Sequence, residues 1–195
     1  MSKDTRSTLV VGDLHGRIEV AEKALATEHK VLFIGDYLDS FDRSIEDQIN
    51  TLRLVLSSIE QEPDRVMGLL GNHEMSYIGP KGMQASGYKA TTYAYLAHMD
   101  LSKLIKYKWI EGFLVSHAGV SQRLLDWREQ SLQDYLAEGD FNQIGTARGG
   151  WHDIGGLYWC DWYSEFKPVP GVKQIVGHSG YRPHSNTGEG MGTRS

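Results

Sequence analysis

Residues 8–16 read TLVVGDLHG, an apolar run that breaks at a glycine and continues with two polar side chains. The run Leu9–Val11 is typical of a buried strand. Asp13 and His15 follow it two residues apart, and Gly16 ends the turn. Taken alone, such a carboxylate could simply hydrogen-bond within the turn. The alternative is a pair of functional groups at a strand end, and the rest of the chain decides between the two.

Four more apolar runs share this arrangement, with a glycine at or near the end of each. They are KVLFIG at 30–35, RVMGLLG at 65–71, FLVSHAG at 113–119 and QIVGH at 174–178. Because these runs are almost continuously apolar, they fit strands that are buried on both faces.

Helical periodicity lies between several of these runs, at residues 17–29, 44–60, 91–107 and 121–138. Ser44 with Asp47, and Ser121, are the expected N-terminal caps of the second and the last of these helices. Strands that alternate with helices predict an α/β fold with a largely parallel central sheet.

The composition is that of an ordinary globular protein, and we expect one domain over residues 1–195. The net charge is -5, which argues against a nucleic-acid or anionic-membrane partner. No apolar run approaches the roughly 20 residues that span a bilayer. The single cysteine, Cys160, excludes an internal disulfide, and the polar start MSKDTRS predicts no signal peptide. A cytoplasmic location is therefore expected.

Each predicted strand delivers Asp, Asn or His just past its end, where ligands bind in open α/β sheets. The candidate metal ligands are Asp13, His15, Asp36, Asn72, His117 and His178. This mixed nitrogen and oxygen set without thiolates suits manganese, iron or zinc rather than calcium. Six ligands exceed what one ion uses beside a substrate, so two ions that share a carboxylate are expected.

The structural alternative at each position is a capping Asp or Asn, or a hydrogen-bonded His without function. We assign that interpretation to the histidines outside the motifs, His29, His98, His152 and His184. Capping explains six potential ligands at five successive strand ends poorly.

The blocks GDLHG, GDYLD, GNHE, SHAG and GHS resemble, in order, the signature blocks of the calcineurin-like metallophosphoesterases. They look most like the phosphoprotein phosphatase branch, with its small bacterial and phage-type members and diadenosine tetraphosphate hydrolase. The resemblance implies a sandwich of two β-sheets flanked by helices, with a di-metal centre at the carboxyl ends of the strands.

The resemblance also implies a role for each motif residue. Asp13 and His15 would hold the first metal ion, Asp36 would bridge both ions, and the second would be completed by Asn72, His117 and His178. His73 would be the general acid, oriented by Asp39. Hydrolysis would proceed by direct attack of a metal-bound hydroxide, with two ions of manganese, iron or zinc, manganese being the expected metal.

Two departures from the family pattern concern phosphate binding and the C-terminus. The second block usually continues to an arginine, whereas Ser40 stands here. We interpret Arg43 as a solvated charged residue of a loop, and Arg148 is the better candidate for binding phosphate. After His178 the chain is short, although SNTGEG resembles the family's DTG-type turn, and the tail 187–195 is expected to be mobile.

The resulting hypothesis is a metal-dependent phosphatase for phosphomonoesters, with phosphoserine, phosphothreonine or phosphotyrosine as substrates. A dinucleoside polyphosphate or another small phosphoester is the enzymatic alternative, because the arginine at position 40 is missing. A scaffold that keeps the fold without turnover is a third interpretation. A nuclease-type phosphodiesterase fits poorly with the acidic charge balance. The sequence leaves the oligomeric state open.

Overall fold

The computed structural model describes residues 6–80, 84–139 and 141–180. The chain forms two compact units, Met1–Lys106 and Tyr107–Ser195. The expectations for His184, for the SNTGEG turn and for the tail 187–195 lie outside the described residues. That the chain acts as one domain stays a prediction.

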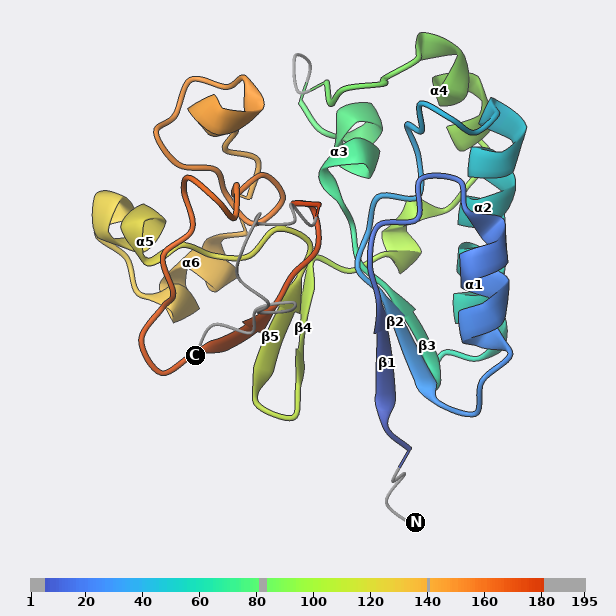
Figure 1. Cartoon of the computed structure of the whole chain (residues 1–195), viewed down its shortest axis with the longest axis horizontal. Coiled ribbons are helices and arrows are strands. Elements are labelled where there is room, and N and C mark those ends of the chain that lie inside the picture. Colours follow the sequence, from blue (N-terminus) through green and yellow to red (C-terminus); the bar gives the residue numbers. More distant parts are fainter. Residues whose placement is uncertain (1–5, 81–83, 140, 181–195) are drawn as a thin grey trace, which may run out of the picture. The chain divides into compact units, whose positions relative to one another are not determined.

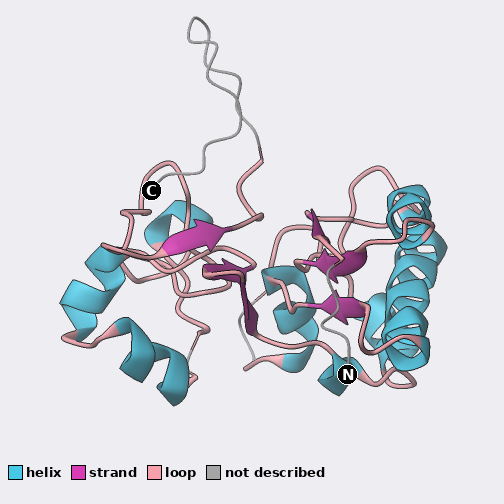
Figure 2. Cartoon of the chain, turned by 90° about the horizontal axis from the view of Figure 1, so that it is seen from below, coloured by secondary structure: helices cyan, strands magenta, loops and turns pink. Residues whose placement is uncertain are grey.

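The first unit is built on a parallel sheet of three strands in the order β1-β2-β3. Figures 1 and 2 show α1 and α2 packed along one side of this sheet, and Figure 1 shows α3 beyond the carboxyl ends of its strands. The elements are β1 (Thr8–Val11), α1 (Ile18–Leu25), β2 (Lys30–Phe33), α2 (Ile45–Gln61), β3 (Val66–Gly68), α3 (Asn72–Ile78), α4 (Ala90–Leu96) and the 3₁₀ turn η1 (Leu101–Lys103).

Strand β2 is the centre of this sheet, and Val31, Leu32 and Phe33 are completely buried, as its apolar run predicts. Strand β1 is only half-buried because it forms an edge. The register pairs Val11 with Phe33 and Phe33 with Gly68, so the three strands end level with one another. The residues that follow them therefore emerge at one edge of the sheet.

Helix α2 confirms the predicted cap and periodicity. The Ser44 side chain accepts the Asp47 N–H, and the Asp47 carboxylate accepts the Ser44 N–H in return. Its apolar face, with Ile49 and Leu52, is buried. The predicted helix 91–107 is wrong in its second half: α4 ends at Leu96, and the Asp100 side chain starts a separate 3₁₀ turn by accepting the Ser102 N–H.

The second unit contains a mixed sheet in the order β4-β5-β6, whereas the sheet of the first unit is entirely parallel, so the expected two small sheets with flanking helices are confirmed. Strands β4 and β5 are antiparallel, and β6 runs parallel to β5. A two-residue turn at Glu111 and Gly112, both with positive φ, connects β4 to β5. The elements are β4 (Tyr107–Ile110), β5 (Phe113–Ser116), α5 (Gln122–Arg128), α6 (Leu132–Glu138), the 3₁₀ turn η2 (Thr146–Arg148) and β6 (Lys173–Ile175).

The predicted helix 121–138 is two helices. Glu129 ends α5 in the left-handed conformation, and the Ser131 side chain caps α6 by accepting the Asp134 N–H. Ser121 does precede α5, but its hydroxyl donates to the Glu165 carbonyl instead of capping the helix. Local side-chain hydrogen bonds thus override a continuous apolar period.

The aromatic segment between Trp151 and Tyr163 is divided between core and surface. Tyr158 and Trp159 are buried, whereas Trp151 is 94% exposed. Among the helices of the described residues, none combines the length and hydropathy needed to cross a bilayer.

Candidate metal centre

Three predicted site residues of the first unit form a compact cluster, which we call the first-unit cluster: His15, Asp36 and His73. The Oδ2 atom of Asp36 lies 3.8 Å from His15 Nε2 and 3.8 Å from His73 Nε2. The two imidazole rings meet edge to face with centroids 4.8 Å apart. One ligand atom from each residue lies within 4.8 Å of the others, a spacing suited to a shared cation.

The ring of His15 is oriented by the backbone. Its Nδ1 lies 2.7 Å from the Leu38 carbonyl oxygen, which can only accept, so Nδ1 carries the proton. In the neutral ring the lone pair is therefore on Nε2, the nitrogen that lies 3.8 Å from Asp36 Oδ2. This is the arrangement in which a carbonyl fixes the tautomer of a metal-binding histidine.

His73 is held by a second carboxylate. Its Nδ1 lies 3.0 Å from Asp39 Oδ2, and both side chains are buried. Burial opposes a charged imidazole, but the neighbouring charge of Asp36 and the hydrogen bond that His73 donates to Asp39 raise the pKa of His73 above its ordinary value. The predicted pairing of His73 with Asp39 is thus present in the first unit.

The backbone is strained at these positions. His15, Asp36 and Asp39 have φ values of 42°, 55° and 59°, and in the second unit His178 has a φ of 64°. Such left-handed backbone is uncommon for residues other than glycine and gathers at functional sites. Both remaining non-glycine positions with positive φ among the described residues, Glu111 and Glu129, lie at a hairpin turn and at a helix end.

Glu74 stabilises the strained loop around Asp36 through hydrogen bonds to backbone N–H groups, a role that sequence reasoning missed. It is completely buried, and its carboxylate accepts the backbone N–H groups of Asp36, Tyr37 and Gly71 at 2.9–3.0 Å. Burial and the Asp36 charge raise the pKa of Glu74 to about 7, although the N–H donors favour the ionised form. Its place in the GNHE block was the only signal for this role.

Gly71 leaves room for Asp36. A Cβ atom at position 71 would lie 2.2 Å from Asp36 Oδ1 and 2.5 Å from the Asp36 backbone nitrogen. We therefore expect Gly71→Ala to destabilise the protein by about 1–3 kcal/mol, because the loop must move, and to weaken metal binding. Thermal unfolding and Mn²⁺ titration measure both effects. The matched control is Gly12→Ala, whose Cβ would meet nothing within 4 Å; equal behaviour of the two variants would contradict the prediction.

The second unit brings two other predicted ligands together, His117 and His178. They follow β5 and β6, which are parallel neighbours, and the Gly177 N–H donates to the His117 carbonyl at 2.8 Å. His117 Nε2 lies 3.2 Å from His178 Nδ1, and their ring centroids are 5.0 Å apart. Two imidazoles at this separation have the spacing of neighbouring ligands on one ion.

Arg148 lies in the second unit and is bound by other residues. Its Nη2 is 2.9 Å from Asp161 Oδ2 and 2.9 Å from the Ser179 hydroxyl. A second buried glutamate, Glu165, holds this segment by accepting the N–H groups of Ala147, Gly155 and Asp161. The predicted phosphate-binding role of Arg148 remains a prediction.

The other predicted residues are placed as follows. Asp13 is half-buried between β1 and α1, and Asn72 is buried at the first position of α3; their ligand roles stay predictions. Ser40 is buried and donates to Asp42 at 2.6 Å. Arg43 forms an ion pair with Glu19 at 2.5 Å.

Three of the histidines outside the motifs lie in the described residues. His29 Nδ1 pairs with the Ser7 hydroxyl at 2.9 Å, His152 packs against Trp127, and His98 is exposed. These surroundings agree with the structural interpretation.

The donor chemistry of the first-unit cluster fits a divalent cation. An imidazole with a fixed tautomer and a buried carboxylate both direct lone pairs at the same space. Nitrogen and carboxylate donors of this kind suit manganese, iron and zinc.

Two solved structures are similar to this chain. A cold-active protein tyrosine phosphatase has a TM-score of 0.58 and 15% identity, over 90% of this chain and 65% of that one. A protein serine/threonine phosphatase from Saccharomyces cerevisiae, with similarity to human phosphatase PP5, has a TM-score of 0.43 and 22% identity, over 59% of this chain and 38% of that one. The chain thus spans less than two thirds of the length of either structure.

No curated protein matches the chain. The sequence profile described as calcineurin-like phosphoesterase matches residues 6–189, nearly the whole chain. The first of the two structural likenesses supports the same fold. The chain therefore belongs to the calcineurin-like phosphoesterases, a family of phosphoric ester hydrolases.

Proposed function

We propose that this chain is a metal-dependent phosphatase that hydrolyses phosphomonoesters, with phosphorylated serine, threonine or tyrosine side chains as substrates. One observation carries the proposal. Asp36 Oδ2 lies 3.8 Å from the Nε2 atoms of both His15 and His73, and the other ring nitrogen of His73 is hydrogen-bonded to Asp39. A cation ligand and a positioned proton donor thus lie side by side, which is what hydrolysis of a phosphoester with a poor leaving group requires.

The proposal assigns the metal ligands in two sets. Asp13, His15 and Asp36 would hold one divalent ion, and Asp36 would bridge to another. The roles that the resemblance implies for Asn72, His117 and His178 as ligands of the second ion belong to this proposal. When bound, the two ions would polarise the phosphoryl oxygens and activate a water molecule.

His73 would donate a proton to the leaving oxygen. Its Nδ1 proton is engaged by Asp39, so the imidazolium presents Nε2–H as the remaining donor. The carboxylates of Asp36 and Asp39 raise the pKa of His73, which favours the protonated ring. After transfer the neutral ring keeps its Nδ1–H on Asp39 and can be reprotonated from solvent.

One observation favours the alternative substrate, a dinucleoside polyphosphate or another small phosphoester. The second motif lacks the arginine that would grip phosphate, and its buried Ser40 is bound to Asp42. The arginines that flank this loop are also engaged, Arg17 with Asp42 and Arg43 with Glu19. Side-by-side rates on a phosphopeptide and on diadenosine tetraphosphate decide between the two substrate classes.

The direct test removes the metal and restores it. Protein stripped with a chelator should be inactive, and added Mn²⁺ should restore hydrolysis of p-nitrophenyl phosphate at a higher rate than that of bis(p-nitrophenyl) phosphate. Initial rates and metal content by mass spectrometry are measured together. Activity that survives chelation, faster cleavage of the diester, or stoichiometric Mn²⁺ uptake without turnover of any tested ester would each overturn the proposal, the last in favour of a scaffold.

A further inference from the structure

We propose that Tyr77 is a positioning residue for the acid: its phenol holds the Asp39 carboxylate in the orientation that keeps the His73 ring in place. The inference rests on the proposed function, because it assigns a part of the same proton donor. Nothing in the sequence motifs singles out Tyr77, which lies beyond the GNHE block in the segment MSYI.

Helix α3 brings both side chains to one carboxylate. His73 and Tyr77 are four residues apart on α3 and therefore lie on the same face of the helix. His73 Nδ1 is bonded to Asp39 Oδ2, and the Tyr77 hydroxyl donates to Asp39 Oδ1. All three residues are buried, so water does not compete readily for these bonds.

The direction of the Tyr77 hydrogen bond is determined by its surroundings. The backbone N–H of Lys89 donates to the Tyr77 hydroxyl oxygen at 3.2 Å, which leaves the phenol proton for Asp39. An ionised carboxylate only accepts, which gives the same direction. The chain Lys89, Tyr77, Asp39, His73 is thus a continuous run of hydrogen bonds that ends on the imidazole.

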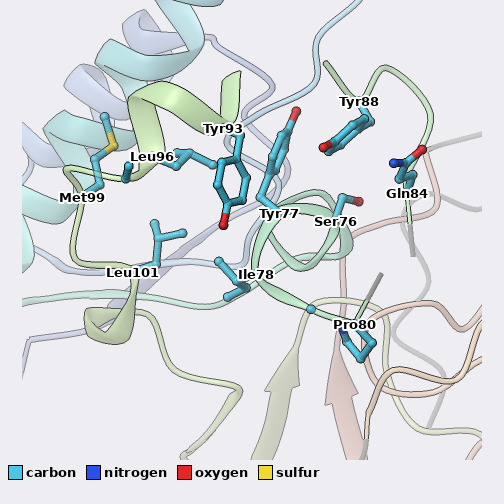
Figure 3. Close-up of a pocket in the computed structure, with 12 residues that line it drawn as sticks. Ser76, Tyr77, Ile78, Pro80, Gln84, Tyr88, Tyr93, Leu96, Met99 and Leu101 are labelled. Atoms are coloured by element: carbon cyan, nitrogen blue, oxygen red, sulfur yellow. The ribbon is translucent and has the colours of Figure 1, made fainter. Parts of the chain in front are cut away.

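The ring of Tyr77 packs against a second aromatic ring. It stacks on Tyr88 with centroids 4.8 Å apart and an interplanar angle of 28°. Figure 3 shows these two rings among the residues of α3, α4, η1 and the connecting loops that line a cavity of about 630 Å³. The hydrogen bonds to Asp39 and Lys89 and the stack on Tyr88 together hold the phenol in position.

Other contacts already hold the backbone of Asp39, so Tyr77 acts on the orientation of its carboxylate. The Asp39 N–H donates to Gln48 Oε1 at 2.8 Å, and Gly87 packs against its carbonyl with room for no side chain. The side-chain torsions remain, and rotation about the Cβ–Cγ bond is the one that exchanges the two carboxylate oxygens. A donor on Oδ1 opposes that rotation and keeps Oδ2 on His73.

The test compares esters that need an acid with esters that do not. In Tyr77→Phe we expect kcat for an alkyl phosphate to fall by about tenfold or more, and kcat for p-nitrophenyl phosphate to change by less than about threefold, because general acid catalysis matters most for poor leaving groups. His73→Asn is the reference for complete loss of the acid. Tyr93→Phe removes the hydroxyl of an exposed tyrosine on the same cavity and is the matched control.

A second readout does not depend on turnover. In the metal-free protein, the Nδ1 proton of His73, identified by its loss in His73→Asn, should give a slowly exchanging NMR signal. Tyr77→Phe should shift this signal and speed its exchange, with little change in thermal unfolding, while Tyr93→Phe leaves it unchanged.

The outcomes separate the two proposals. Equal losses on both esters, or an unchanged His73 signal in Tyr77→Phe, would overturn the positioning role and leave the phosphatase proposal standing. A wild-type protein without metal-dependent turnover would overturn the phosphatase proposal. The NMR signal would then still decide whether Tyr77 positions the Asp39–His73 pair.

Discussion

Asp36→Asn is expected to lose metal-dependent hydrolysis by more than about a hundredfold while the protein keeps its fold. Substitution of a residue that only supports a metal ligand typically lowers metal affinity or activity by about 10- to 100-fold. Substitution of a direct ligand should lower them further. Asparagine has the same shape and tolerates the left-handed backbone found here, with a φ of 55°. The side-chain oxygen of the asparagine can still accept the backbone N–H of His73, which donates to Asp36 Oδ1 at 3.1 Å in the wild type. What disappears is the negative charge at Oδ2, which faces both imidazoles.

Calorimetric Mn²⁺ titration, initial rates and thermal unfolding check this prediction together. The matched control is Asp42→Asn in the same loop, where the carboxylate is 62% exposed and pairs with Arg17 at 3.0 Å. We expect this exposed pair to matter little. Stoichiometric Mn²⁺ binding with wild-type rates in Asp36→Asn would show that Asp36 is not a ligand.

Glu74→Ala is expected to destabilise the first unit by at least about 3 kcal/mol, because three buried N–H groups lose their acceptor and each such loss costs about 1–3 kcal/mol. The groups left without a partner belong to Asp36, Tyr37 and Gly71. The strained backbone at Asp36 would relax once these bonds are gone, so metal affinity should fall as well.

Glu74→Gln should fall between Glu74→Ala and the wild type, because an amide keeps one oxygen acceptor and replaces the other with a donor that faces an N–H. Urea unfolding of the metal-free proteins measures the free energies. Glu60→Ala is the control, since that carboxylate is 68% exposed and only pairs with Lys103; it should change stability by less than about 0.5 kcal/mol. Similar unfolding midpoints for Glu74→Ala and Glu60→Ala would refute the supporting role of Glu74.

Structural features that depend on residues close together in the chain could be predicted from the sequence. The five strand runs, the Ser44–Asp47 cap of α2 and the polar residues after each strand all appear where the sequence indicates them. The apolar period also predicted one helix over 121–138, but it could not show the division at Glu129. There a left-handed residue and the Ser131 cap outweigh a helical period that continues across both.

Strand β4 and helix α3 also escaped prediction. Strand β4 lies at the edge of its sheet, with half-buried residues at its two ends and exposed residues between them, so it carries little apolar signal. Helix α3 begins with the three polar motif residues Asn72, His73 and Glu74, which conceal the start of the helix. In both elements, pairing or packing with distant residues decides the conformation.

The sequence by itself determined which chemical groups stand at the strand ends, because strand periodicity and glycine turns are local properties. Only the tertiary structure decided which of these groups meet and what supports them. Glu74 accepts N–H groups 37 and 38 residues away, and Tyr77 reaches Asp39 across 38 positions. The physical reason is that a buried polar group must find its partner wherever the fold brings one, and no local pattern specifies that partner.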